Sequence, residues 1–359
     1  MGLPFLNRQA KRRDQIVAID LGGRSTKAVH LQRRGEFFSL VNYALMDAPV
    51  YEKSMSSEIL ADHLRNVRDS LGSGRTRQVT LAMSVTDTMF RQVEVPLMPV
   101  ADLRQMLKFN SKNYLQQELP NHIFDCCYVI SRTPARPAEG AKPGAANIQK
   151  QKVAVGGIKK TLIDDIQAAI KGAGLIPDQV VPGMIGPTNA FEMAEPEIYA
   201  KDAVALVDIG FKNSTVTILD AGEIQLNRVV AIGGDRLTAG LAEVMNISYQ
   251  EAESIKVGMP MEVQPHLEAL INPLGRELRA SIDFFEHQHD KTISQVFISG
   301  GSARSEFIIQ ALQAELMAPC RSWNPAKFLQ LALPPEKMGD VEHVVPQLAV
   351  AIGAAASAI

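Results

Sequence analysis

The chain has 359 residues, 46% of them hydrophobic and 21% charged, and its formal net charge is −2. These values are typical of an ordinary globular protein of two or three domains, and they exclude the basic excess that nucleic-acid-binding proteins usually carry. The three cysteines, two of them adjacent, fit neither a disulfide framework nor a zinc site. We therefore expect reduced cysteines and no nucleic-acid partner.

The N-terminal residues 1–14 are predicted to be a flexible leader. They contain no long apolar stretch and no cleavage site, which excludes a signal peptide. Leu3, Phe5 and Leu6 stand near basic residues, so a weak membrane-touching tail is the alternative. No apolar run is long enough to span a bilayer, and the apolar end at 348–359 is predicted to be a buried helix.

The first predicted unit is a three-stranded β-meander. A strand at 16–19 runs into the turn DLGG at 20–23, and a second strand follows at 27–31. A Gly-Glu turn then leads into a third strand at 37–43. Residues 15–96 are predicted to form the base of a first lobe around this meander.

Residues 97–185 are predicted to be an inserted subdomain of the first lobe. The pattern predicts a helix at 100–118, strands at 124–131 and 152–158, a helix at 160–172 and a short strand at 179–181. The loop at 132–151 is rich in proline and alanine and is predicted to be a hairpin tip. Residues 186–200 are then expected to add helices to the first lobe.

The meander recurs in the second half of the chain. A strand at 204–207 runs into the turn DIGF at 208–211, and strands follow at 215–219 and 224–232. An offset of 188 residues places the turn at 20–23 on this second turn. Either copy alone would be an ordinary hairpin turn, but self-similarity over about half the chain indicates a duplicated unit.

The residue types in both turns suit a bound phosphate. Gly22 and Gly210 have no side chains, so backbone N–H groups can approach a phosphate closely. The carboxylates of Asp20 and Asp208 end the first strand of each meander, where they can order the hydration shell of a Mg²⁺ ion or an attacking water. Small hydroxyls that could donate to phosphate stand at Ser25, Thr26, Ser214 and Thr215. The two turns therefore predict a phosphate clamp with a metal between its halves.

A third glycine-containing segment follows a buried strand near the C-terminus. The strand at 295–298 leads into SGGS at 299–302 and a helix at 303–316. Paired glycines let a flat base or ribose lie against the backbone, and a helix N-terminus adds donors. The spacing is not G-x-G-x-x-G, so a dinucleotide-binding fold is not favoured.

Two helix starts lie between these segments. A glycine pair at 233–234 precedes a helix for which Asp235 is the expected N-cap. A capping box at 248–251 starts the next helix, which places Glu253 and Lys256 on one face. By itself this pair would be an ion pair on the protein surface.

Together these motifs resemble the actin/Hsp70/sugar-kinase ATPase superfamily. Its phosphate-1, phosphate-2 and adenosine motifs are similar to IDLGGRSTK at 19–27, VDIGFKNST at 207–215 and FISGGSARS at 297–305. Within the superfamily, IDLGGRSTKAVHL, VPLMP at 95–99 and VVAIGGDRLTAGLAE at 229–243 are most similar to the PilM family of type IV pilus assembly, with FtsA next.

The resemblance implies an α/β, actin-like ATPase fold. Two duplicated lobes would each contain a mixed β-sheet flanked by helices, with inserted subdomains. Residues 201–235 and 293–340 would form the base of the second lobe, and 236–292 its helical cap. Residues 341–359 would return to the first lobe.

The resemblance also assigns the motifs to a site for ATP and Mg²⁺. Asp20 and Asp208 would be the catalytic carboxylates that face the attacking water and, through water, the metal. The residues that would line the nucleotide are Gly22, Gly23, Ser25 and Lys27 in loop one, Gly210, Ser214 and Thr215 in loop two, Gly233 and Gly234 beside it, Glu253 and Lys256 on ribose and base, and Gly300, Gly301 and Ser302 on the adenosine. Phe211 and Lys212 stand where many active ATPases carry small glycines, so we expect binding with slow or no hydrolysis.

The resulting hypothesis is an ATP-binding cytoplasmic scaffold of type IV pilus or type II secretion assembly, rather than an enzyme. The family likeness implies that it docks the cytoplasmic N-terminal peptide of a single-pass, PilN-like protein, and so lies at the inner face of the inner membrane. The pilus assembly ATPases and a second copy of the chain, as a homo-oligomer, are further candidate partners.

Two alternatives share the fold. A sugar kinase would need a carboxylate beside a sugar pocket and, in one branch, a Cys/His zinc cluster, and neither is recognised in the sequence. An FtsA-like, filament-forming membrane protein would end in a basic amphipathic helix, but no Lys or Arg follows Lys337.

Overall fold

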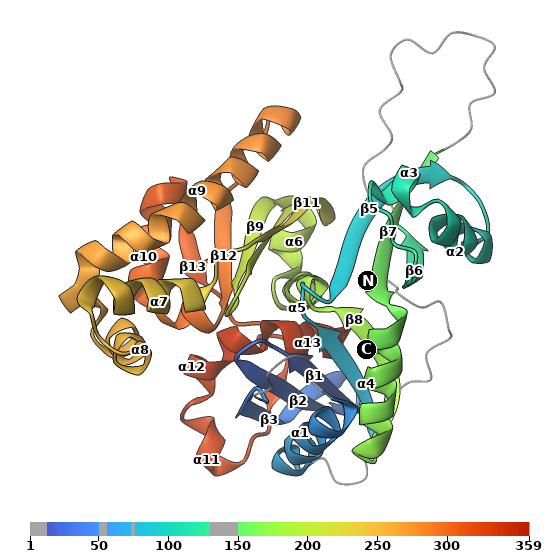
Figure 1. Cartoon of the computed structure of the whole chain (residues 1–359), viewed down its shortest axis with the longest axis horizontal. Coiled ribbons are helices and arrows are strands. Elements are labelled where there is room, and N and C mark those ends of the chain that lie inside the picture. The colour runs from blue at the N-terminus through green and yellow to red at the C-terminus, as the bar shows by residue number, and fades with distance from the viewer. Residues whose placement is uncertain (1–12, 50–55, 73–75, 130–149, 359) are drawn as a thin grey trace.

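The computed structural model describes residues 13–49, 56–72, 76–129 and 150–358. Figure 1 shows two lobes beside one another, with a smaller sheet at one end of the first. Most of the expected leader at 1–14 and of the loop at 132–151 lies outside the described residues.

The first lobe is built on a six-stranded sheet of order β14-β3-β2-β1-β4-β8. Its strands are β1 (Gln15–Leu21), β2 (Ser25–Arg34), β3 (Phe37–Asp47), β4 (Gln78–Met83), β8 (Ile176–Pro182) and β14 (Gln330–Leu331). The first three form the predicted antiparallel meander, while β1, β4 and β8 are parallel. The carboxyl ends of the parallel strands therefore lie at one edge of the sheet, where Asp20 stands near the end of β1 and Gly22 follows it.

Alternation along β1 places its side chains in two different cores. Val17 and Ile19 pack with the helices α1 (Ser57–Leu71) and α4 (Lys160–Gly172). Ile16 and Ala18 face the central core, which contains α5 (Gly186–Ala194) and α13 (Ala349–Ala356). Because successive side chains of a strand point to opposite faces, a strand buried on both sides reads as the continuous apolar run of IVAI.

The second lobe repeats this plan with a five-stranded sheet of order β11-β10-β9-β12-β13. Its strands are β9 (Ala203–Ile209), β10 (Ser214–Asp220), β11 (Glu223–Val230), β12 (Gln295–Gly300) and β13 (Cys320–Ser322). Its outer face is covered by helices whose buried side chains form one core, namely α7 (Gly234–Met245), α8 (Tyr249–Gly258), α9 (Gln264–His289) and α10 (Glu306–Leu316). Its inner face packs on α5 and α13, so these two helices lie between the sheets (Figure 1).

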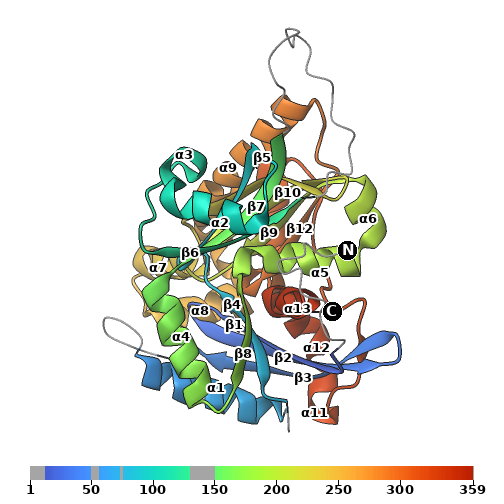
Figure 2. The same cartoon turned by 90° about the vertical axis from the view of Figure 1, so that its right-hand side faces the viewer.

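A separate three-stranded sheet of order β5-β7-β6 forms the inserted part. It consists of β5 (Thr88–Pro96), β6 (His122–Tyr128) and β7 (Lys150–Lys159), with α2 (Val100–Phe109) and α3 (Ser111–Leu115) packed on it. In Figure 2 this sheet lies above the first-lobe base. The expected helix at 100–118 is divided, because Asn110 leaves the helical conformation at φ −130° and ψ 33°.

The expected boundaries of the insert, 97 and 185, differ from those of this sheet. The strand β5 already pairs with β7, so the insert starts at Thr88, directly after the short turn that ends β4. At the other end, α4 packs on α1 and β8 pairs with β4, so both belong to the first lobe. The sequence shows each strand but not the sheet that it joins.

The C-terminal part of the chain crosses back to the first lobe earlier than expected. The strand β14 pairs with β3, so the second lobe does not extend to residue 340. The remaining helices are α6 (Pro196–Lys201), α11 (Pro335–Met338) and α12 (Val341–Val344). The apolar end forms α13, which contacts β1, β2 and β4 as a buried helix. Within the described ranges, no helix is both long and hydrophobic enough to cross a bilayer.

Candidate functional site

A cleft of about 1500 Å³ lies between the two lobes. It is lined by the loops after β1 and β9, by the end of β12 and by α8. The predicted site residues that line it are Asp20, Gly22, Gly23, Ser25, Lys27, Asp208, Gly210, Thr215, Gly234, Glu253, Lys256, Gly300, Gly301 and Ser302. Residues nearly 300 positions apart in the sequence are therefore brought to one cavity.

The two Asp-x-Gly turns have the same backbone shape. A Cβ on Gly22 would stand 2.6 Å from the carbonyl oxygen of Ser25, and one on Gly210 would stand 2.7 Å from that of Asn213. Each glycine thus lies against the carbonyl three residues later, which no other residue type allows without movement. The shared geometry at the 188-residue offset supports the duplication seen in the sequence.

The two carboxylates lie close enough to influence each other. Burial raises the pKa of Asp20, against the opposing effect of Lys27, whose Nζ is 3.4 Å from Oδ2. Burial also raises the pKa of Asp208; a hydrogen bond from Ser299 Oγ at 2.8 Å opposes this, and the charge of Asp20 adds to it. Two poorly solvated carboxylates share one lysine, so a further cation bound beside them would stabilise their ionised forms.

Loop two is held by the backbone at the start of α7 in addition to contacts of its own side chains. The N–H groups of Gly234 and Asp235 donate to the carbonyls of Gly210 and Phe211, both at 2.9 Å. The first donors of α7 are therefore already satisfied. Since a Cβ on Gly233 would stand 2.3 Å from the carbonyl oxygen of Phe211, this glycine supports the loop from behind.

Three sequence-based assignments change on this geometry. Ser214 does not line the cleft, because its buried hydroxyl donates to the carbonyl of Ile232 at 2.6 Å. Gly233 does not line it either. Asp235 is not the N-cap of α7, which is Gly233; its carboxylate instead accepts hydrogen bonds from Lys212 and Tyr249, at 2.6 and 2.9 Å. Each residue supports the second loop from behind.

Glu253 and Lys256 form an ion pair in which Lys256 is buried and Glu253 partly buried, not the surface ion pair that spacing alone suggests. The predicted capping box starts α8, and the side chain of Lys256 is only 8% exposed. Lys256 Nζ donates to Glu253 Oε2 and to Thr238 Oγ1, both at 2.7 Å. Burial raises the pKa of Glu253, but hydrogen bonds from Lys256 and Thr238 outweigh it, so the pKa lies below its usual value. The carboxylate is therefore ionised and faces the cleft.

The segment expected to bind adenosine ends β12 and packs against α7. Gly301 opens a 3₁₀ turn, η3 (Gly301–Arg304), and α10 starts only at Glu306 with Ser305 as its N-cap. The glycine pair therefore leads into a 3₁₀ turn that includes Gly301, whereas the sequence predicts a helix from residue 303. A Cβ on Gly234 would stand 3.2 Å from Ser302 Oγ, so the two segments are in direct contact.

Arg24, which was not among the predicted site residues, reaches across the cleft to the second lobe. A guanidinium nitrogen lies 3.3 Å from Glu253 Oε1, and its Cζ stands 5.7 Å from the centroid of the Phe211 ring. The sequence does contain a signal for this residue, because Arg24 is the one large side chain among the small residues of GGRST. Other missed residues line the cleft farther along, including Thr161, Asp165, Arg304 and Arg321.

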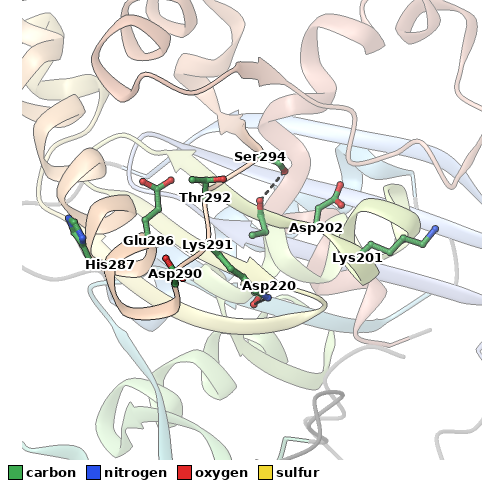
Figure 3. A pocket seen from close by; sticks show the side chains of 10 residues that line it. Lys201, Asp202, Asp220, Glu286, His287, Asp290, Lys291, Thr292 and Ser294 are labelled. Atoms are coloured by element: carbon green, nitrogen blue, oxygen red, sulfur yellow. Dashed lines mark hydrogen bonds and ion pairs between the residues drawn. The ribbon is translucent and has the colours of Figure 1, made fainter. Parts of the chain in front are cut away.

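A second hollow of about 590 Å³ lies at the opposite end of β9 and β10 (Figure 3). Asp202 and Ala203 line it at the start of β9, whereas Asp208 lies at the other end of that strand. Lys291 donates to Asp220 at 2.6 Å across its floor. Its charged groups are too far along the strands to take part in the interlobe cleft.

Groups of three or more histidine, cysteine, aspartate or glutamate side chains that could hold a metal are absent from the described part of the chain. The cysteines are unpaired thiols, and burial raises the pKa of Cys126 to about 11 and of Cys127 to about 12.

Comparisons with known proteins agree with this architecture. A family model described as type IV pilus assembly protein PilM matches residues 18–358. A solved "PilM-PilN type IV pilus biogenesis complex" gives a TM-score of 0.78 at 19% identity, covering 96% of this chain and 98% of that one. The ethanolamine utilization protein EutJ from Carboxydothermus hydrogenoformans gives a TM-score of 0.53 at 16% identity, with 97% and 91% covered.

A curated relative matches over a shorter segment. The cell division protein FtsA of Bacillus subtilis (strain 168) is 26% identical over 98 residues, which are 27% of this chain and 21% of FtsA. The match thus spans about a fifth of FtsA. The predicted α/β, actin-like ATPase fold is confirmed by the structural matches.

Proposed function

The chain belongs to the family of the type IV pilus assembly protein PilM, and from this we propose that it is an ATP-binding scaffold of type IV pilus or related type II secretion assembly. One observation carries the nucleotide part of this proposal. The two Asp-x-Gly turns open on one cleft, together with the ion pair between Glu253 and the buried Lys256 and the glycines at the end of β12.

The residues of the cleft fit ATP with Mg²⁺. Backbone groups around Gly22 and Gly210, with the ammonium group of Lys27, would hold the phosphates. Glu253 and Lys256 would bind ribose and base, and the glycines after β12 would face the adenosine. Bound Mg²⁺ would supply positive charge beside Asp20 and Asp208, whose raised pKa values report two poorly solvated carboxylates.

The structure of the second loop favours binding of ATP over its hydrolysis. The Phe211 ring lies against loop one, since its Cδ1 is 3.7 Å from where a Cβ of Gly23 would stand. The first N–H groups of α7 are already bonded to loop two, which leaves them unable to stabilise charge on a leaving phosphate. We therefore propose slow or no hydrolysis, with Asp20 and Asp208 mainly organising metal and water.

The partner proposal rests on family membership and on the solved complex of a PilM with a PilN. The occupant would be the cytoplasmic N-terminal peptide of a PilN-like inner-membrane protein. Through that peptide the scaffold would be held at the inner face of the inner membrane. Pilus assembly ATPases and a second copy of this chain are the further partners that we propose.

Calorimetry with Mg-ATP tests the nucleotide part. The wild-type protein should bind, and Asp208→Ala should bind at least about tenfold more weakly, which corresponds to about 1.4 kcal/mol. Asp220→Ala is the matched control, because Asp220 ends the neighbouring strand outside the cleft. The proposal would be wrong if the wild type released no heat, or if Asp208→Ala bound as tightly as Asp220→Ala.

Fluorescence anisotropy tests the partner part. A labelled N-terminal peptide of a PilN-like protein from the same organism should bind, whereas a scrambled peptide should not. The titration is run without nucleotide, with Mg-ADP and with Mg-ATP. No binding in all three states would contradict the scaffold proposal while leaving nucleotide binding intact.

A further inference from the structure

Arg24 is the one residue in the phosphate-1 turn whose side chain reaches an ion partner in the opposite lobe, among the contacts of the described residues. It leaves the first lobe between Gly23 and Ser25 and ends 3.3 Å from Glu253 Oε1 on α8. On its way it lies over the Phe211 ring of the phosphate-2 loop. It therefore touches both parts of the second lobe that face loop one.

The two oxygens of Glu253 have different partners. Oε2 accepts hydrogen bonds from Thr238 and Lys256, which belong to the same lobe, at 2.5 and 2.7 Å. Oε1 has the cross-lobe ion pair with Arg24. The free side of this carboxylate, which a ribose hydroxyl would need, is therefore covered by a group from the phosphate loop.

The cross-lobe pair is weak enough to exchange. The Arg24 side chain is 46% exposed and that of Glu253 is 23% exposed, and ion pairs with such exposure contribute roughly 0–1 kcal/mol. Phosphate is a stronger partner for a guanidinium, because two parallel N–H groups can donate to its oxygens. Arg24 starts from the loop that would hold those phosphates.

We propose that Arg24 is an exchangeable clasp between the lobes, which covers Glu253 when the cleft holds no nucleotide and turns to the phosphates when it does. This proposal rests on the nucleotide-binding function proposed above. A guanidinium that turns to the phosphates leaves its position beside Glu253 Oε1, so phosphate binding uncovers Glu253 for the ribose. The clasp makes the phosphate and ribose ends of the site depend on each other, and it selects nucleotides over nucleosides.

Adenosine, ADP and ATP distinguish a clasp from a simple phosphate ligand. Their affinities are measured, with Mg²⁺, for the wild type, Arg24→Gln and Arg24→Lys. Arg236→Gln is the control, because Arg236 is an exposed arginine on α7 outside the cleft lining. In Arg24→Gln, adenosine should bind about two- to fivefold more tightly, the range expected for one partly exposed ion pair, while ATP should bind more weakly. Arg24→Lys should lie between the wild type and Arg24→Gln for ATP.

The possible results distinguish a failure of the clasp from a failure of the proposed nucleotide binding. Tighter adenosine together with weaker ATP in Arg24→Gln supports the clasp. Adenosine affinity that shows no gain, in a protein that still binds ATP, overturns it and leaves ATP binding standing. A wild-type protein that binds neither ATP nor ADP overturns the proposed function and the clasp with it.

Discussion

The two phosphate loops have the same backbone shape, but different contacts hold them in place. Loop one (20–27) is held by side chains: Thr26 Oγ1 lies 2.7 Å from the buried His63 Nε2 of α1, and Lys27 pairs with Asp20. Loop two (208–215) is held in addition by the backbone of α7, which donates to the carbonyls of Gly210 and Phe211, and by the hydroxyl of Ser214. After duplication, the close approach of glycine to carbonyl was retained in both, whereas the side chains diverged.

This difference fits the different side chains of the two loops: loop one sends a side chain to the opposite lobe, whereas loop two is occupied by bulky residues. Loop one keeps small residues around Arg24, whose side chain is free to cross the cleft. Loop two places Phe211 and Lys212 in the corresponding positions, and the centroid of the Phe211 ring lies 5.7 Å from Arg24 Cζ and 5.1 Å from Lys212 Nζ. A clamp with one adaptable and one fixed side suits retention of a nucleotide better than its turnover.

The largest expected effect comes from breaking the backbone support of loop two. In Gly233→Ala the new Cβ would meet backbone atoms of Phe211 at 2.3 and 2.6 Å, so α7 and the loop must move apart. We expect a loss of at least about 2 kcal/mol in the free energy of unfolding, measured with urea. Gly23→Ala is the control in loop one, where the nearest atom is Phe211 Cδ1 at 3.7 Å. Equal stability of the two variants would contradict the backbone support of loop two.

A second pair of variants tests whether the loops remain equivalent as phosphate cradles. Gly22→Ala and Gly210→Ala place a Cβ against carbonyls at 2.6 and 2.7 Å. Both should weaken Mg-ATP binding by about tenfold, or about 1.4 kcal/mol. Titration calorimetry on variants shown to be folded by circular dichroism provides the measurement. If only one variant lost affinity, the nucleotide would be held by one lobe.

The smallest expected effect concerns the side-chain support of loop one. Burial lowers the pKa of His63 below its usual value of 6.5, so the unfolded chain binds a proton at a higher pH than the folded protein does. Stability is therefore present above pH 6.5 and is lost as the pH falls below it. His63→Gln keeps an amide beside Thr26 but does not titrate, and should reduce the fall in Tm between pH 7 and 5.

His30 limits the size of that change. Burial also lowers the pKa of His30. His30 therefore still destabilises the folded protein at low pH, so the fall in Tm should become smaller in His63→Gln without disappearing. His287→Gln, at an exposed position of α9, should keep the wild-type profile. An unchanged profile in His63→Gln would show that protonation of His63 does not affect the stability of the folded protein.

The sequence predicted the repeated parts of the molecule well. The two meanders, the Asp-x-Gly turns and the capping box of α8 all have local signals, because glycine, aspartate and strand alternation act over a few residues. The edges of the inserted sheet were missed, since β5 continues from β4 after a short turn and nothing local says which sheet it joins.

The site was predicted less completely where side-chain direction determines which residues face the cleft. Ser214 and Thr215 are adjacent in a strand, so only one can face the cleft, and a pattern of two hydroxyls does not tell which. Burial of Lys256 depends on Thr238 of another helix. Arg24 found its partner 229 positions later, at Glu253, a contact that sequence spacing does not reveal.

Hydrogen exchange with and without Mg-ATP tests most directly the central claim that both lobes hold one nucleotide. We predict slower exchange in three separate segments on addition of Mg-ATP: residues 20–27, 208–215 and 300–305. The hollow around Asp220 and Lys291 in Figure 3 should not change, since it lies at the far end of the strands. Protection confined to one lobe, or absent from all three segments, would contradict the account.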